Sequence, residues 1–140
     1  MKRAVRIRIE SRQAENVAVQ QARGHLYLND GVYYLRYAEP DAELGAVMTT
    51  VRWDGEQIRI VRRGSVESEM TFRAGKRTYG TYALPQGRAV LECRTERIDA
   101  RIGGGFGTIA WSYDLYIDGM HAGQLGLKLV IEEEVADERS

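Results

Sequence analysis

Alternation of apolar and polar residues with a period of two constrains this chain more than any other feature. Residues 66–72 show it most clearly, because every second side chain is suited to a protein interior and those between them are polar: Val66, Ser68, Met70 and Phe72 against Glu67, Glu69 and Thr71. Successive side chains of a β-strand point to opposite faces. The pattern therefore predicts a strand with one buried face, whereas a helix would need apolar residues at a period of about 3.6.

The same alternation recurs along the chain between short turn signals such as Asp54-Gly55 and Gly64-Ser65. Pairs of this kind are typical of tight β-hairpins. The segments expected to form strands are 4–10, 17–28, 32–38, 46–53, 57–63, 66–72, 77–84, 88–102, 108–118 and 122–132. Short connections favour an up-and-down meander, and a twisted meander closes because closure removes exposed edges. We predict an all-β fold, a closed antiparallel up-and-down barrel of about eight to ten strands.

Domain organisation follows from the extent of this pattern. Residues 1–132 are expected to form one barrel domain, and residues 133–140 an acidic, flexible tail. In two of the expected strands, the apolar residues shift partway along from odd-numbered to even-numbered positions. Such a shift predicts one β-bulge near Gly24 and another near residues 95–97. Residues 11–16 are expected to form a polar connection, and residues 103–107 a flexible one.

Composition narrows the classes of function. The chain has 20 basic and 20 acidic residues, so its net charge is zero, and no basic tail indicates binding to nucleic acid or to a membrane. One cysteine and two histidines do not suffice for a typical structural zinc site, so no cofactor is expected. With no apolar leader and no pair of cysteines, the sequence favours a cytoplasmic protein. No catalytic arrangement stands out, and an enzyme is the less favoured interpretation.

One end of the predicted barrel gathers polar side chains. Alternate strands of a meander run in the same direction, so segments 32–38 and 57–63 finish at the same end. Their inward rows continue to Glu39 and to Arg62, which places a carboxylate beside a guanidinium. Tyrosines on strands of the same direction are expected near this opening. The candidate ligand-binding residues are Tyr37, Glu39, Arg62, Tyr82 and Tyr113.

Two interpretations of this opening remain. In the first, an apolar barrel with convergent polar groups binds a small amphipathic or anionic ligand. In the second, Glu39 and Arg62 satisfy each other and close a barrel filled by its own side chains, which then serves as a structural or protein-interaction module. Either a monomer or a homodimer is compatible with the sequence. The second interpretation requires an exposed apolar patch, for which the outward residues are Val32, Tyr34, Val61, Val90 and Val130.

Three stretches resemble the YwiB-like family of small bacterial proteins. They are Gly31–Glu39, Arg62–Val66 and Ile109–Asp114, and the similarity extends over roughly residues 4–132. The resemblance implies a lipocalin-like, or calycin-like, β-barrel whose interior can hold a small molecule. It implies no catalytic residue, because the family has no activity from which one can be transferred.

Overall fold

The barrel predicted from the alternation is the fold observed. The computed structural model describes residues 2–40, 45–104 and 106–134, and its strands form one closed antiparallel sheet in the order β1-β10-β9-β8-β7-β6-β5-β4-β3-β2. The ten strands are β1 (Lys2–Gln13), β2 (Asn16–Asn29), β3 (Val32–Ala38), β4 (Val47–Trp53), β5 (Gln57–Gly64), β6 (Ser68–Arg73), β7 (Arg77–Leu84), β8 (Gly87–Gly103), β9 (Phe106–Ile117) and β10 (Met120–Glu133).

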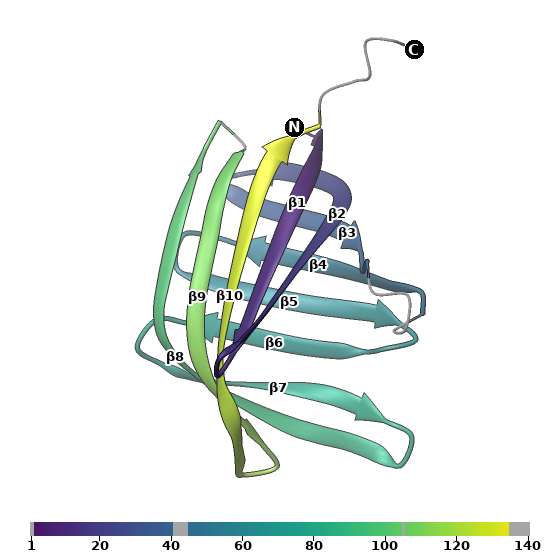
Figure 1. The fold of residues 1–140 in the computed structure, drawn as a ribbon, viewed down its shortest axis with the longest axis vertical. Helices are drawn as coiled ribbons and strands as arrows, with labels where there is room; N and C mark the ends of the chain where they lie inside the picture. Colours follow the sequence, from purple (N-terminus) through teal and green to yellow (C-terminus); the bar gives the residue numbers. More distant parts are fainter. Residues whose placement is uncertain (1, 41–44, 105, 135–140) are drawn as a thin grey trace.

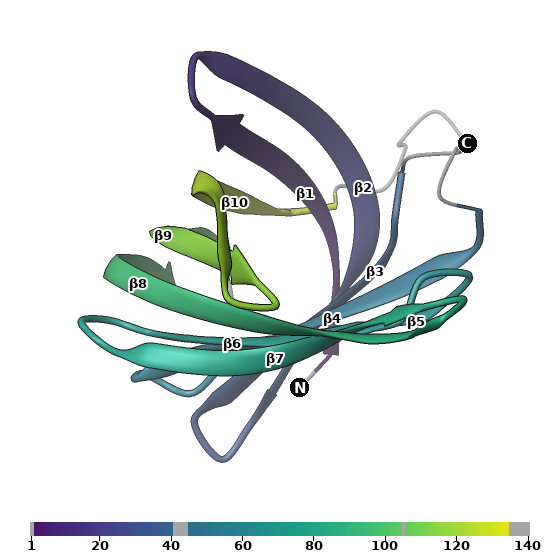
Figure 2. The same cartoon turned by 90° about the horizontal axis from the view of Figure 1, so that it is seen from below.

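The barrel is flattened into two crossing layers. Figure 1 shows β8, β9, β10, β1 and β2 running steeply across β3 to β7, which lie behind them. Figure 2 shows the long β1–β2 hairpin arching away from the rest of the wall. Strands that bend from one layer into the other belong to both, so the two layers remain parts of one closed sheet. No helix in the described residues is long and apolar enough to cross a membrane.

Side chains fill the space between the layers. The inward rows predicted for β3, β4 and β6 are confirmed, since Leu35, Val51 and Phe72 are each at most 2% exposed. The ring of Phe72 lies 5.6 Å from that of Trp111 and 4.5 Å from that of Tyr113, which are offset, tilted contacts that rings favour. The core thus occupies the centre of the barrel and leaves its opening near Glu39 as the place for a polar site.

The bulge predicted near Gly24 is wrong. β2 keeps one register against β1 and against β3, and its inward phase runs unchanged through Gly24. Val17 and Val19, which suggested the phase change, face outward and are 53% and 49% exposed. A Cβ atom at Gly24 would lie 2.2 Å from the carbonyl oxygen of Arg36, so the glycine lets the two backbones approach as the strand coils.

Other irregularities agree only partly with the sequence prediction. The bulge in β8 is confirmed, because its register against β9 shifts between Thr95 and Arg97. A second shift, between His121 and Gly123 of β10, was not predicted. The expected polar connection at 11–16 is instead a tight turn at Ala14 and Glu15, since Gln13 already pairs with Asn16.

The ends of two predicted segments fall partly outside the described residues. Gly103 of β8 pairs with Phe106 of β9, so the expected 103–107 connection is reduced to the turn between them, and residue 105 lies outside the described part. β10 continues through Glu133, and the amide of Glu134 donates to the carbonyl of Ala4 over 3.1 Å. Residues 135–140 of the expected tail also lie outside the described part.

Candidate functional site

Strand register brings polar side chains into one inward row across five strands. Tyr37 of β3 pairs with Thr49 of β4, and Thr49 pairs in turn with Arg62 of β5. Arg62 then pairs with Ser68 of β6, and Ser68 with Tyr82 of β7. Because each pair lies side by side on the same face of the sheet, the row forms a polar ring segment above the apolar core.

Glu39 extends this row at the barrel opening. Its carboxylate Oε1 accepts a hydrogen bond from the Thr49 hydroxyl at 2.6 Å and one from Arg62 Nε at 3.4 Å. The Glu39 side chain is only 8% exposed, whereas that of Arg62 is 31% exposed. The carboxylate is therefore held inside the wall by two donors, and the guanidinium reaches from the interior toward water.

The Arg62 guanidinium uses only part of its hydrogen-bond donors in this arrangement. Within the described residues its hydrogen bond to Glu39 is made by Nε, and its terminal nitrogens donate to no other residue. A guanidinium carries five N–H donors in a planar fork that matches a carboxylate or a phosphate. The half of the fork that faces the opening is thus free to bind a ligand.

A small cavity lies beside Arg62. Its volume is about 70 Å³, and its lining combines the polar groups of the opening with apolar residues from four strands. The lining residues are Ile9, Ser11, Gln20, Tyr37, Glu39, Ile60, Arg62, Trp111, Leu127 and Leu129. A cavity of this size holds a few water molecules or a small chemical group, and it is far smaller than the roughly 300–1,000 Å³ of a drug-sized pocket.

Two buried donors near this ring have no partner. Nε1 of Trp111, a residue that lines the cavity, and Ser68 Oγ, in the polar row, make no hydrogen bond within the described residues. A buried polar atom without a partner costs stability, so such atoms are rare in native proteins. An acceptor brought into the cavity could satisfy the Trp111 indole N–H.

Both buried tyrosines remain neutral. Burial, followed by the Glu39 carboxylate, raises the pKa of Tyr37 well above its ordinary value, and Arg62 opposes this only partly. Burial and Cys93 likewise raise the pKa of Tyr113, again against Arg62. At neutral pH both phenols are therefore hydrogen-bond donors as well as acceptors, and the site carries no tyrosinate base.

The structure brings together some of the predicted site residues and separates others. Tyr37, Glu39 and Arg62 line the cavity as a group. Tyr82 shares their row but does not line the cavity, because it lies two strands beyond Arg62. Tyr113 points into the core against Phe72 and is 4% exposed. A ligand that occupies the cavity contacts neither of these two tyrosines unless side chains move.

Several residues of the site were absent from the prediction. Thr49 interrupts the otherwise apolar inward row Val47–Val51, and such a polar residue on a buried row is a visible sequence signal. Gln20 was missed because the bulge predicted near Gly24 placed it on the outward face. Ser11 was missed because residues 11–16 were expected to form a connection and not a strand. Counting back in steps of two from Leu26 would have placed Gln20 inside.

Groups associated with catalysis lie elsewhere or are unreactive. Cys93 is buried, and burial raises the pKa of its thiol from 9.0 to about 12, so it is not a thiolate at neutral pH. His121 bonds Asp114 at 3.0 Å on the exposed surface. The described residues contain no group of three side chains suited to hold a metal ion. In the described part of the chain, the groups that line the cavity are hydrogen-bonding and apolar side chains.

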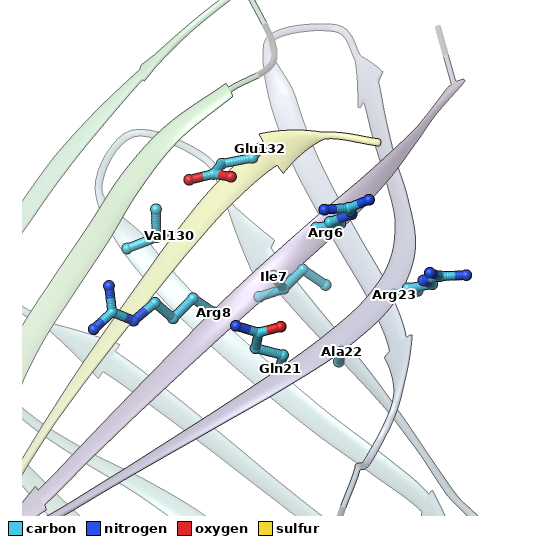
Figure 3. Close-up of a pocket in the computed structure, with 8 residues that line it drawn as sticks. All are labelled: Arg6, Ile7, Arg8, Gln21, Ala22, Arg23, Val130 and Glu132. Atoms are coloured by element: carbon cyan, nitrogen blue, oxygen red, sulfur yellow. The ribbon is translucent and has the colours of Figure 1, made fainter. Parts of the chain in front are cut away.

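A larger hollow of about 610 Å³ lies over the outer face of β10, β1 and β2. Two register rows line it, Glu132–Arg6–Arg23 and Val130–Arg8–Gln21. Figure 3 shows the side chains of Arg6 and Arg23 pointing away from that of Arg8. Because the guanidinium groups diverge, this hollow has no single point at which they converge on an anion, and the Glu39–Arg62 opening remains the better candidate.

The fold and the site define a small closed β-barrel with a filled core and a polar pair at one opening. The chain belongs to the family described as Domain of unknown function (DUF1934), whose model matches residues 4–129. It is 27% identical over 109 residues to the uncharacterized beta-barrel protein YwiB of Bacillus subtilis (strain 168), covering 78% of this chain and 76% of that protein.

A solved structure supports the same fold. The crystal structure of the ywiB protein from Bacillus subtilis matches with a TM-score of 0.78 and 20% sequence identity, covering 96% of this chain and 94% of that one. At that identity the similarity establishes the β-barrel and its extent. The function of the family is unknown, so any function of this chain must be argued from its own residues.

Proposed function

We propose that this protein binds a small organic anion, a short-chain carboxylic acid, at the Glu39–Arg62 opening. The observation that carries the proposal is the guanidinium of Arg62, which is partly buried beside a cavity and whose terminal nitrogens donate to no other described residue. The carboxylate would bind this fork, as Arg–carboxylate pairs commonly do. The Trp111 indole N–H, which has no partner among the residues that the structure describes, would provide a further donor.

Size and polarity define the class of ligand. Ile9, Ile60 and Leu129 give the cavity an apolar wall suited to a short hydrocarbon chain. Its volume of about 70 Å³ does not admit the long chain of a fatty acid. A lipocalin-like or calycin-like barrel in the cytoplasm, with its ligand at one open end, is the setting that we propose for this binding.

The test measures binding of straight-chain carboxylates, from acetate to octanoate, by calorimetry and by the shift in melting temperature. We expect saturable binding of the short acids and its loss as the chain lengthens toward octanoate. Arg62→Gln should abolish binding, whereas Glu39→Gln should strengthen it, because it removes the carboxylate that competes for Arg62. Arg59→Gln, on the outer face of the same strand, is the matched control and should bind as wild type. Equal binding by wild type and Arg62→Gln, or no binding of any probe, would overturn the proposal.

A second candidate function is the interaction module, which the filled core favours. Of the outward residues expected to form its patch, Val90 is 52% exposed, whereas Val32, Tyr34, Val61 and Val130 are partly buried. The partial burial of four of the five residues supports a contact elsewhere on the surface for such a module.

A further inference from the structure

One stretch of the barrel wall lacks a neighbour. β2 pairs with β1 along its whole length, but it pairs with β3 only over Gly24–Asn29. Residues 16–23 therefore form a strand edge that no other strand in the described part of the chain covers. Figure 2 shows this part of β2 arching away from β3. We call these eight residues, Asn16–Arg23, the free edge.

The hairpin fixes which backbone groups the free edge presents. Gln13 and Asn16 close a two-residue turn, and the closing pair of such a hairpin exchanges its hydrogen bonds. The N–H and C=O groups then point alternately toward β1 and away from it. Those of Val17, Val19, Gln21 and Arg23 point outward, where they are ready to pair with another strand.

The free edge lacks the protection found on another exposed edge of the same barrel. Beyond its bulge, β8 pairs with β9 alone among the strands and carries alternating charges at Asp99 and Arg101. Charged residues are a common device against unwanted pairing of edges. Residues 16–22 contain no charge, and Val17 and Val19 are 53% and 49% exposed. The contrast indicates that the free edge is built to be paired.

Charges at its two ends suggest what pairs with it. Glu15 has no ion-pair partner within the described residues, and it lies in the turn at one end. Arg23, at the other end, stands directly opposite Arg6 of β1, a like-charge pair that Glu134 offsets at 3.2 Å from Arg23. An antiparallel copy of the same edge would bring Glu15 of each copy beside the Arg23 of the other, whose side chain is 75% exposed despite its contact with Glu134.

We propose that two copies of this protein associate through their free edges, antiparallel, around a two-fold axis at Val19. In this register Val19 faces Val19 of the second copy, Val17 faces Gln21, and Glu15 faces Arg23. Each copy uses the same patch in this arrangement, because a two-fold axis relates the two copies. The contact therefore joins two copies and leaves no edge for a third. A neutral edge with opposite charges at its ends favours a second copy over an unrelated peptide.

The experiment measures the mass of the full chain by light scattering and its self-association by analytical ultracentrifugation. We expect a reversible dimer at micromolar concentrations. Val19→Lys should raise the dissociation constant at least tenfold without changing the melting temperature of the monomer, because this exposed position would then oppose two like charges. Arg101→Glu on the β8 edge is the control and should leave the dimer unchanged.

A charge exchange tests the register itself. Glu15→Lys and Arg23→Glu should each weaken the dimer, and the double variant should restore it, because each new acid again faces a new base. A monomer at every concentration would overturn the proposal, as would a dimer indifferent to Val19→Lys. A dimer that Val19→Lys disrupts but the double variant does not restore would overturn the Val19-centred register. None of these results depends on whether a carboxylate binds at Arg62.

Discussion

Glu39 and Arg62 form an unequal pair, because water reaches the guanidinium but hardly reaches the carboxylate. Removing the partner of a buried charge is usually costly, since the charge that remains has lost its compensation. Thr49 would stay as the other donor to Glu39. The stability lost when Arg62 is removed therefore comes mainly from the buried Glu39 carboxylate, which loses its compensating charge, and less from the loss of the other contacts of Arg62.

We expect Arg62→Ala to lower the free energy of unfolding by about 2 kcal/mol, less than for a fully buried pair because Arg62 is partly exposed. Arg59→Ala should cost less than about 1 kcal/mol, because Arg59 pairs with Glu69 on the exposed face. Urea unfolding of both variants at pH 7 measures the difference. Equal costs would show that Glu39 does not depend on Arg62 for its compensation.

Cys93 makes stability depend on alkaline pH. Its pKa is raised by burial in the folded state, from 9.0 to about 12, so the neutral thiol is favoured by folding. The stabilisation is complete below pH 9 and is lost as the pH rises toward 12. From low pH to pH 10 the loss from this one group is on the order of 1 kcal/mol, because pH 10 lies about one unit above the ordinary pKa of the thiol.

Chemical unfolding of wild type and Cys93→Ala at pH 7, 9 and 10 measures this contribution. We expect the wild type to lose more stability over this range than the variant, whatever their difference at pH 7. The tyrosines are present in both proteins, so the difference between the two slopes reports the thiol together with its effect on Tyr113. Parallel slopes would contradict the assignment.

At the scale of one element, β2 is shaped by Gly24. Its backbone lies against that of β3, and a Cβ atom would come within 2.2 Å of the Arg36 carbonyl oxygen and 2.9 Å of Tyr37 Cβ. Neither neighbour is the flexible end of a side chain. The strand can therefore enter the second layer only with glycine at this position, and the free edge begins where this contact ends.

We expect Gly24→Ala to lower the free energy of unfolding by about 2–3 kcal/mol, the usual cost of forcing extra atoms into a packed site. Gly126→Ala is the matched control in β10, where the added Cβ would lie 3.8 Å from its nearest neighbour. That change should be close to neutral. Thermal and urea unfolding measure both variants, and a neutral Gly24→Ala would show that the strands can separate at little cost.

The whole barrel closes through junctions of very different length. β8 and β9 share twelve register pairs, whereas β6 and β7 share two, Ser68 with Tyr82 and Glu69 with Thr81. The turn before β7 bonds β8 instead, with Gly75 N–H donating to the Thr95 carbonyl at 2.9 Å. The hydroxyl of Thr78 also donates to the Thr71 carbonyl across the junction. The wall is closed there by few backbone pairs.

Among the junctions between neighbouring strands, we expect hydrogen exchange to find the least protection here, in the amides of residues 70–73 and 77–80 that face each other. Local opening requires few broken hydrogen bonds there, and such regions exchange first. The amides between β8 and β9 are the internal reference and should exchange slowest. Faster exchange between β1 and β10 would place the weak point of the barrel at the meeting of the chain ends instead.

Particular residues show how far sequence reasoning reaches. The parity of β3 and β5 predicted Tyr37, Glu39 and Arg62 at one opening, because each strand is short and keeps a single phase. β2 was misinterpreted because Val17 and Val19 are apolar but face water, and alternation alone cannot distinguish an exposed free edge from a buried row. The sequence prediction left Gln20 out of the site for the same reason.

The sequence by itself determined the ten strands, their meander order and the parity of most rows, because these depend on neighbours close along the chain. Only the tertiary structure decided how much interior space remained, which donors were left without partners and which edge stayed uncovered. Those properties arise from packing between strands distant in sequence, where differences of an ångström separate a cavity from a filled core.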